Sequence, residues 1–304
     1  MGKIIGILGG MGPLATADLF EKIVRLTDAA CDNDHIHIII DNNAQIPDRT
    51  AAILHGGPDP VPAMLASARL LERARCDAIL MPCNTAHYFI GRLQSGVSVP
   101  FLNMLEETAR AVRAAGIARV GLLATDGTCR TGIYEKAMAA CGVATLLPEP
   151  DDQRMVMETI YQVKAQDEDL PVARLRELAE KFRARGAGGL VLGCTELPIA
   201  FEQIPTALPQ YDPTTILAKS AIRFAGKRVR PDRRAGLSAY RQGKERGENR
   251  NGTFTARRPA VWRGGARRHS RRRRGDHPHR PGAGGPHARC RRLGRGGSGR
   301  HPWL

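Results

Sequence analysis

The stretch Asp77-Ala-Ile-Leu-Met-Pro-Cys-Asn-Thr-Ala-His87 decides the fold. Its apolar run, residues 78–81, predicts a short buried strand. Pro82 ends that strand, because proline has no amide hydrogen to donate to a sheet ladder. Cys83 therefore follows the carboxyl end of a strand, which is where open α/β sheets bind their ligands. A helix that begins directly afterwards would stabilise the thiolate of Cys83 through its N-terminal amides.

The same design occurs a second time. Gly188-Gly-Leu-Val-Leu-Gly-Cys-Thr-Glu-Leu-Pro198 is another apolar strand that ends in a cysteine and a threonine, and Lys3–Gly12 has its echo in Arg119–Gly127. The spacing from the first glycine of each echo to the cysteine is similar, 77 positions from Gly6 to Cys83 and 73 from Gly121 to Cys194. Two halves with this spacing predict a duplicated domain, and a pseudo-twofold axis between them would let the two thiols face each other.

Strands and helices alternate along the first three quarters of the chain. This order is typical of a parallel, doubly wound sheet in each half. Leu14, Ala17, Phe20 and Val24 share one face of the first helix. The second strand is almost entirely apolar, which predicts a sheet covered on both sides. The expected strands are 3–8, 35–40, 78–81, 119–124 and 188–193, and the expected helices are 13–29, 60–75, 104–115, 128–140, 152–165, 171–185 and 213–225.

Four motifs in this order resemble the aspartate/glutamate racemases, which use no pyridoxal phosphate. The resemblance runs from about Lys3 to Ala225, and it is most similar to the aspartate racemase branch because Glu196 stands where glutamate racemases usually carry histidine. It implies two similar α/β domains, residues 1–100 and 101–207, with the helix at 208–226 returning to the first. The motifs are Gly9-Gly-Met-Gly-Pro13, Gln45-Ile-Pro-Asp-Arg-Thr50, Pro82-Cys-Asn-Thr-Ala-His87 and Leu192-Gly-Cys-Thr-Glu-Leu-Pro198.

Cys83 and Cys194 are the predicted catalytic pair. Racemisation removes the proton on Cα and returns one to the opposite face, so two groups on opposite faces perform it directly as base and acid. A thiol suits both roles, since its reference pKa of about 8.5 makes either protonation state accessible near neutral pH. The alternative is that both are buried small hydrophobes. That alternative is our interpretation of the other five cysteines, Cys31, Cys76, Cys129, Cys141 and Cys290.

Polar residues beside the two cysteines are the expected donors to the substrate carboxylate. Asn84, Thr85 and Thr195 directly follow the cysteines, and negative charge accumulates on that carboxylate as the carbanion forms. Helix capping is the alternative role for these side chains. Met11, within the glycine turn, is expected to contribute its backbone.

The resemblance also supplies two cations for the carboxylates of an acidic amino acid. They correspond to Arg49, from the Ile-Pro-Asp-Arg motif, and Lys164 in the second half; a surface lysine near a helix end is the alternative for Lys164. Gln45 is a supporting residue of the same motif as Arg49. Glu196 either tunes Cys194, orients the substrate ammonium or is a solvated acid at a helix start. His87 either orients the site or is a hydrogen-bonded packing residue.

Charge is distributed unevenly over the 304 residues. Residues 227–304 hold 24 of the 46 lysines and arginines but only 4 of the 30 acidic residues, so their net charge is +20, against −4 for residues 1–226. Apolar periodicity ends at the same point, which predicts a disordered basic tail because burial cannot offset the entropy of ordering. Two further interpretations are a nucleic-acid-binding arm and an out-of-frame reading of GC-rich DNA.

Composition narrows the class of protein. Seven cysteines without close clustering predict no disulfide framework, and no C-x-x-C spacing predicts a zinc site. No apolar run reaches the length that spans a bilayer, and the run at 4–8 is too short for a signal peptide. We therefore expect a cytoplasmic protein without membrane contact. The resemblance to the racemases implies an enzyme that acts on a small amino acid as a homodimer, without a cofactor or metal.

Other functions remain open at this stage. Gly10-Met-Gly-Pro-Leu-Ala15 fits the dinucleotide-binding pattern G-x-G-x-x-A, but Asp41 lies 29 residues beyond Gly12, later than that pattern expects, and the repeated cysteines stay unexplained. A related two-cysteine isomerase, such as a maleate isomerase, is the leading enzymatic alternative. A non-catalytic amino-acid-binding protein and a nucleic-acid-binding protein that uses the basic tail are alternatives of other classes.

Overall fold

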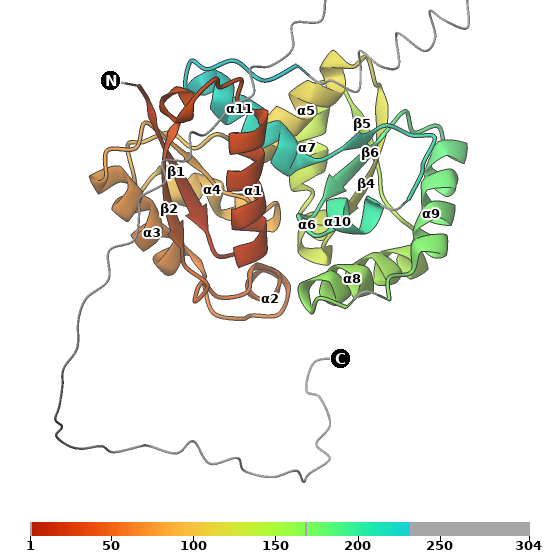
Figure 1. The fold of residues 1–304 in the computed structure, drawn as a ribbon. Helices are drawn as coiled ribbons and strands as arrows, with labels where there is room; N and C mark the ends of the chain where they lie inside the picture. The colour runs from red at the N-terminus through yellow and green to blue at the C-terminus, as the bar shows by residue number, and fades with distance from the viewer. Residues whose placement is uncertain (1, 168, 203, 232–304) are drawn as a thin grey trace, which may run out of the picture. The chain divides into compact units, whose positions relative to one another are not determined.

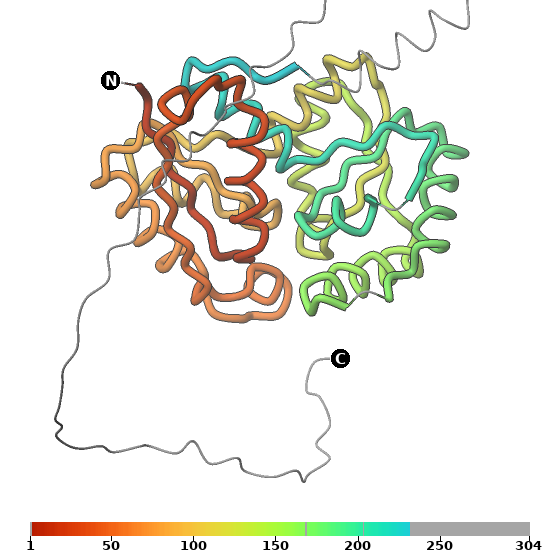
Figure 2. The backbone as a smooth tube through the Cα atoms, in the orientation of Figure 1, coloured from red at the N-terminus to blue at the C-terminus, as the bar shows by residue number. Residues whose placement is uncertain are grey.

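The computed structural model describes residues 2–231 except 168 and 203, and these residues form two α/β lobes, each built on one parallel sheet (Figures 1 and 2). The predicted fold class is therefore confirmed. The expectation of disorder in the basic segment concerns residues that, from 232 onward, lie outside the described part of the chain. Within the described residues, no helix is both long and apolar enough to cross a bilayer.

The first lobe contains three parallel strands in the order β2-β1-β3. Phe101 extends this sheet through a parallel bridge to Ile79 of β3. The central strand β1 is buried along almost its whole length, whereas β2 is only half-buried and its Ile40 is exposed. This strand is more exposed than β1 because it forms the edge of the sheet. Ile38 and Ile39 nevertheless pack against different core clusters, so the prediction of a sheet covered on both sides is confirmed. The strands are β1 Ile4–Gly9, β2 His37–Asn42 and β3 Ala78–Leu80.

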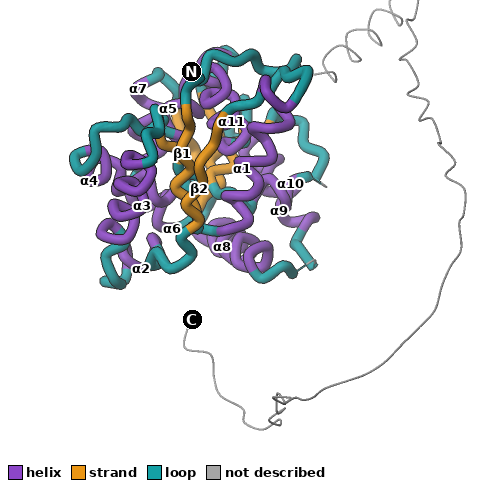
Figure 3. The backbone as a smooth tube through the Cα atoms, turned by 60° about the vertical axis from the view of Figure 1, so that its left-hand side comes forward, coloured by secondary structure: helices purple, strands orange, loops and turns teal. Residues whose placement is uncertain are grey.

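Helices cover both faces of this sheet because successive side chains of β1 point in opposite directions. Ile5 packs against Ile23 of α1, and Leu8 lies in the core cluster that contains Met64 of α3. Figure 3 shows α1 and α3 on opposite sides of β1 and β2. The helices of the lobe are α1 Pro13–Leu26, the 3₁₀ helix η1 Asp32–Asp34, α2 Arg49–Leu54, α3 Val61–Arg73, the 3₁₀ helix η2 Thr85–Phe89 and α4 Ile90–Gln94.

The second lobe repeats this plan with four parallel strands in the order β5-β4-β6-β7. Tyr134 and Met138 of α7 pack with Val120 and Leu122 of β4 in one core cluster, whereas Phe182 of α9 belongs to the core cluster formed with α8. The strands are β4 Arg119–Ala124, β5 Ala144–Leu146, β6 Leu190–Gly193 and β7 Gln210–Tyr211. The helices are α6 Asp126–Thr131, α7 Ile133–Ala140, α8 Pro150–Lys164, α9 Val172–Ala184 and α10 Leu197–Phe201.

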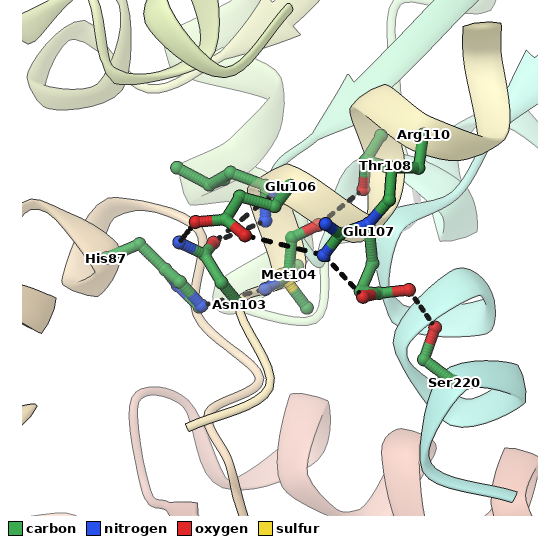
Figure 4. Close-up of polar contacts among 9 residues, drawn as sticks. His87, Asn103, Met104, Glu106, Glu107, Thr108, Arg110 and Ser220 are labelled. Atoms are coloured by element: carbon green, nitrogen blue, oxygen red, sulfur yellow. Dashed lines mark hydrogen bonds and ion pairs between the residues drawn. The ribbon is translucent and has the colours of Figure 1, made fainter. Parts of the chain in front are cut away.

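Each lobe ends in a helix that packs on the other lobe. After the Phe101 bridge, Asn103 caps α5 (Met104–Ala114), whose buried side chains join the core of the second lobe. After β7, Asp212 caps α11 (Pro213–Phe224), which packs on α1 of the first lobe. The two crossing helices also touch each other, and Ser220 donates a hydrogen bond to Glu107 at 2.5 Å (Figure 4).

Two helices differ from the sequence predictions in an informative way. Along α1 the buried residues include Leu19 and Ile23, while the apolar face predicted from Leu14, Ala17, Phe20 and Val24 is exposed. The helix expected at 128–140 is two helices, because Gly132 adopts a left-handed conformation with φ of 62° and ends α6. A glycine accommodates this conformation at little cost, so Gly132 alone is enough to end the helix.

The first residues of the basic segment pair with the first lobe. Val229 forms an antiparallel bridge with Thr27, at the end of α1. The amide of Asp28 donates to the carbonyl of Arg228 at 2.9 Å, and the amide of Arg230 donates to the carbonyl of Leu26 at 2.7 Å. The ordered structure therefore continues beyond Lys227, the residue at which the tail was predicted to begin.

Candidate active site

A pocket between the two lobes is lined by side chains that follow four strands of the two sheets. Met11 follows β1, Cys83 follows β3, Thr125 follows β4 and Cys194 follows β6. Carboxyl ends of parallel strands are the usual ligand sites of open α/β sheets. The complete lining is Met11, Asp48, Arg49, Thr50, Cys83, Asn84, Thr85, Thr125, Lys164, Cys194, Thr195 and Glu196.

Cys83 sits in a tight turn directly after β3. Its amide donates to the carbonyl of Met81 at 2.8 Å, and the residue is 7% exposed. The helix expected after it is the single 3₁₀ helix η2, followed by α4. Asn84 occupies the N-cap position of η2, but its side chain makes no capping hydrogen bond. The capping alternative therefore does not account for this asparagine.

Cys194 lies against a carboxylate. Its thiol donates to Oε2 of Glu196 at 2.9 Å, and the Thr195 hydroxyl donates to the same oxygen at 3.0 Å. Burial, followed by the negative charge of Glu196, raises the pKa of the Cys194 thiol well above its ordinary value, although Lys164 acts in the opposite direction. Glu196 is 8% exposed, so it is not the solvated helix-start acid considered from the sequence.

Arg49 is held by neutral groups. Its guanidinium donates to the carbonyls of Pro47 at 2.9 Å, Met11 at 3.2 Å and Ile46 at 3.3 Å. Its Nε is buried without a hydrogen-bond partner among the described residues. These carbonyls fix the direction of the guanidinium without cancelling its charge, which leaves the cation able to bind an anion.

Lys164 reaches the pocket from the last turn of α8. Burial lowers its pKa, but its electrostatic interactions with Cys194, Glu196 and, more weakly, Cys83 outweigh burial and raise the pKa above its ordinary value. The residue as a whole is nevertheless exposed. Its ammonium therefore stays charged and adds a second cation to the pocket.

Three threonine hydroxyls form a closed triangle beside Cys83. Thr85 contacts Thr125 at 2.9 Å and Thr128 at 3.0 Å, and Thr125 contacts Thr128 at 3.0 Å. Thr85 belongs to the first lobe and the other two to the second. The hydroxyl of Thr85 therefore joins the two lobes, in addition to lining the pocket.

Two predicted supporting residues lie outside the pocket lining. His87 is buried behind Cys83, where its Nδ1 contacts the Cys83 carbonyl at 2.8 Å and its Nε2 accepts from the amide of Met104 at 3.1 Å. Because Nε2 is an acceptor, Nδ1 carries the proton and donates. Burial lowers the pKa of His87 to about 4, so the ring is neutral near pH 7. Gln45 is exposed, and its backbone N–H donates to Oδ1 of Asn43 at 3.1 Å.

The glycine turn after β1 is explained by close packing. Gly10 has φ of 91°, and a Cβ atom there would lie 2.2 Å from the backbone of Asn43. A Cβ atom on Gly9 would lie 2.4 Å from the side chain of Thr16. Both glycines are thus required by their neighbours, without any bound dinucleotide.

A family model described as Asp/Glu/Hydantoin racemase matches residues 8–221. The chain belongs to this family. The family assignment confirms the resemblance read from the four motifs. This racemase is therefore an isomerase that inverts amino acids without pyridoxal phosphate.

Individual relatives agree with this assignment. The broad specificity amino-acid racemase RacX of Bacillus subtilis strain 168 is 28% identical over 223 residues, which cover 72% of this chain and 96% of that protein. The structure of an aspartate racemase from Picrophilus torridus is 35% identical with a TM-score of 0.68, and the match covers 75% of this chain and 96% of that one. An aspartate racemase homologue from Pyrococcus horikoshii OT3, 23% identical with a TM-score of 0.62, shares the fold and covers 74% and 100% of the two chains.

Three residues of the racemase pocket were not singled out from the sequence. Asp48 and Thr50 flank Arg49, so the motif that indicated the arginine also contained them. Thr125 follows β4 as the glycine turn follows β1, and the echo between the two halves could have indicated it. Among the described residues, no group of three or more His, Cys, Asp or Glu side chains is arranged to hold a metal ion.

Proposed function

We propose that this racemase inverts an acidic amino acid, aspartate or glutamate or both, by proton transfer between Cys83 and Cys194. The observation that carries the proposal is their common pocket, where each cysteine follows the equivalent strand of its lobe. One thiolate removes the proton from Cα, and the other thiol gives its proton to the opposite face. The thiolate and the thiol have then exchanged states, so the same pair performs the reverse reaction.

Two cations support the choice of an acidic substrate. Arg49 and Lys164 come from different lobes and line the same pocket. An acidic amino acid brings two carboxylates, and one cation for each compensates for the loss of their hydration. The 35% identical structure from Picrophilus torridus is an aspartate racemase, which favours aspartate, whereas RacX is a broad-specificity enzyme.

The protonation state of Cys194 suggests how the pair rests before substrate binds. Because burial and Glu196 raise its pKa, Cys194 is a thiol in the resting enzyme. Cys194 is then ready to act as the acid, which gives its proton to Cα. For the opposite enantiomer Cys194 has to act as the base, so its proton must first be lost.

The decisive experiment uses purified protein and single enantiomers of aspartate and glutamate in D2O, without pyridoxal phosphate. Proton NMR and chiral chromatography follow deuterium at Cα and stereochemistry together. Inversion with one deuterium incorporated at Cα supports the proposal. Conversion of maleate with no effect on amino acids would instead support the related isomerase, and binding without exchange of either enantiomer would support a non-catalytic binding protein.

The homodimer, the cytoplasmic location and the absence of any further cofactor stay predictions. Nucleic-acid binding through the basic segment stays an alternative. Size-exclusion chromatography with light scattering tests the dimer. Nucleic-acid binding through residues 232–304, which lie outside the described part of the chain, would weaken steeply with salt if it came from charge alone. Tight binding of one sequence at physiological salt would contradict the expectation that the basic segment has no specific partner.

A further inference from the structure

The side-chain amide of Asn84 is held in one orientation at the pocket. Its Oδ1 lies 2.6 Å from the hydroxyl oxygen of Tyr134. Its Nδ2 is buried and has no hydrogen-bond partner in the described part of the chain. Asn84 is only 3% exposed and lines the pocket. Since buried donors are nearly always satisfied, this NH2 group has the character of a ligand-binding donor.

The hydrogen bond from Tyr134 reaches the oxygen end of the amide. Hydrogen bonds between two oxygens are about 2.5–3.0 Å long, whereas those between nitrogen and oxygen are about 2.7–3.2 Å. The separation of 2.6 Å therefore fits the amide oxygen as acceptor and the tyrosine hydroxyl as donor. With the oxygen fixed in this way, the nitrogen is left for the pocket.

Tyr134 is a rigid donor that comes from the other lobe. It lies on α7, is completely buried and packs with Val120 and Met138 in the second core. Burial raises the pKa of its hydroxyl, so the proton needed for donation is retained at working pH. The orientation of the Asn84 amide is thus set by the packing of the lobe that carries Cys194.

The neighbours of Asn84 also contact the second lobe or the helix that crosses to it. Thr85 contacts Thr125 and Thr128 of the second lobe. His87 accepts from the amide of Met104, the first residue of the crossing helix α5 (Figure 4). These contacts fix the backbone of the Cys83 turn relative to the second lobe. Among them, the Tyr134 bond acts on a pocket-lining side chain whose Nδ2 has no partner among the described residues.

We propose that Tyr134 is a positioning residue for racemisation, which fixes the Asn84 amide so that its Nδ2 donates to the substrate carboxylate. This inference rests on the proposed function. As the proton leaves Cα, negative charge moves onto the adjacent carboxylate, and a donor already aimed at it is worth more in the transition state than in the bound substrate. Without the hydroxyl, the amide can present its oxygen, which repels the carboxylate.

The test is the substitution Tyr134→Phe, which removes one oxygen and keeps the buried ring. We expect kcat/KM for inversion to fall about 5- to 100-fold, mostly through kcat, because a buried acceptor loses its donor. Tyr88→Phe is the matched control. Tyr88 lies in η2, near Asn84 in the sequence, but its side chain is 50% exposed. Its kcat/KM should equal that of the wild type.

A double-mutant cycle separates positioning from a structural role. If Tyr134 acts through Asn84, Tyr134→Phe has no further effect on kcat/KM in an Asn84→Ala background. Asn84→Asp keeps the acceptor for Tyr134 but removes the donor, so it should lose at least as much activity as Tyr134→Phe. Unchanged kcat/KM in Tyr134→Phe, or an equal loss in both backgrounds, would overturn the inference.

Aspartate affinity, measured by calorimetry on the same proteins, keeps the two proposals apart. If the wild type exchanges no α-proton, the proposed function fails, and the affinity cycle still decides the role of Tyr134. If the wild type is active and Tyr134→Phe matches it in rate and affinity, only the Tyr134 inference fails. Coupling between Tyr134→Phe and Asn84→Ala in either quantity supports it.

Discussion

The two cysteine turns occupy equivalent places in the two lobes but have opposite surroundings. Behind Cys83 lies a neutral imidazole, because burial lowers the pKa of His87 to about 4. Beside Cys194 lies the carboxylate of Glu196, 2.9 Å from the sulfur. The duplicated fold therefore places two identical groups in different surroundings, and the carboxylate beside Cys194 favours its protonated form. Symmetric chemistry on Cα does not require a symmetric site, only two states that substrate turnover exchanges.

Removing either thiol should have the largest effect, because each cysteine turn is expected to supply one of the two bases. Cys83→Ser and Cys194→Ser should each abolish net inversion, a loss of at least about 10³-fold, because serine is a far poorer base near neutral pH. Each variant is still expected to exchange the α-proton of one enantiomer, and the two variants should act on opposite enantiomers. The measurement is deuterium exchange at Cα for each enantiomer separately.

Cys141→Ser is the matched control, since this cysteine is half-buried and lies outside the active-site pocket. It should invert at the wild-type rate. Full activity in either Cys83→Ser or Cys194→Ser would refute the two-base proposal. Exchange of the same enantiomer in both variants would show that the thiols do not face opposite sides of Cα.

Neutralising Glu196 should make the two turns more alike. In Glu196→Gln the negative charge that raises the pKa of Cys194 is gone, so its thiolate forms at lower pH. The alkaline limb of kcat/KM, where the acid loses its proton, should move to lower pH, with a change near neutral pH below about tenfold. Because the two enantiomers are equally stable, kcat/KM must be the same for both at every pH, and the shift must appear in both.

The ultraviolet absorbance of the thiolate gives a second readout for this variant, with Glu196→Gln/Cys194→Ser as the blank. Glu177→Gln, an exposed position on α9, is the matched control and should leave the profile unchanged. An alkaline limb at the wild-type position would mean that Glu196 does not control the proton on Cys194.

On the Cys83 side, His87 should control stability at acid pH. Its pKa of about 4 in the folded protein lies below the ordinary value of 6.5. As pH falls below 6.5, the unfolded chain binds a proton that the folded protein does not, so stability is present above that pH and is lost down to about pH 4. The wild type should lose up to about 3 kcal/mol more unfolding free energy over this range than His87→Gln.

Urea unfolding at a series of pH values measures this difference, and the groups common to both proteins cancel in the comparison. Equal slopes for the wild type and His87→Gln would mean that the imidazole takes up a proton as readily in the folded protein as in the unfolded chain.

The sequence predicted those parts of the molecule that depend on local pattern and repetition. The apolar runs before Cys83 and Cys194 fixed two strands, and the motif spacing indicated most of the pocket lining. The exposed face of α1 was misleading, because Leu14, Phe20 and Val24 have helical spacing whichever way the helix turns. Burial depends on which face meets the sheet, and the spacing does not contain that information.

Contacts between the lobes were the least predictable part of the site. Nothing near Tyr134 in the sequence indicates that its hydroxyl reaches Asn84, 50 positions away, at 2.6 Å. The threonine triangle likewise joins Thr85 to Thr125 across 40 positions. Such pairs follow from the relative placement of two cores, which no local pattern encodes.

The crossing helices end differently in the two lobes, and this difference predicts the smallest effect, a change in stability. After α11 the chain turns back, and residues 227–230 pair with the end of α1 in the first lobe. Truncation after Gly226 removes this pairing, while truncation after Pro231 keeps it. We expect the shorter protein to be less stable by about 1–2 kcal/mol, the value of two backbone hydrogen bonds, with equal racemisation rates for both. Urea unfolding and chiral chromatography check this. Equal stability would mean that the pairing contributes nothing, and a slower protein ending at Pro231 would show that the basic segment takes part in activity.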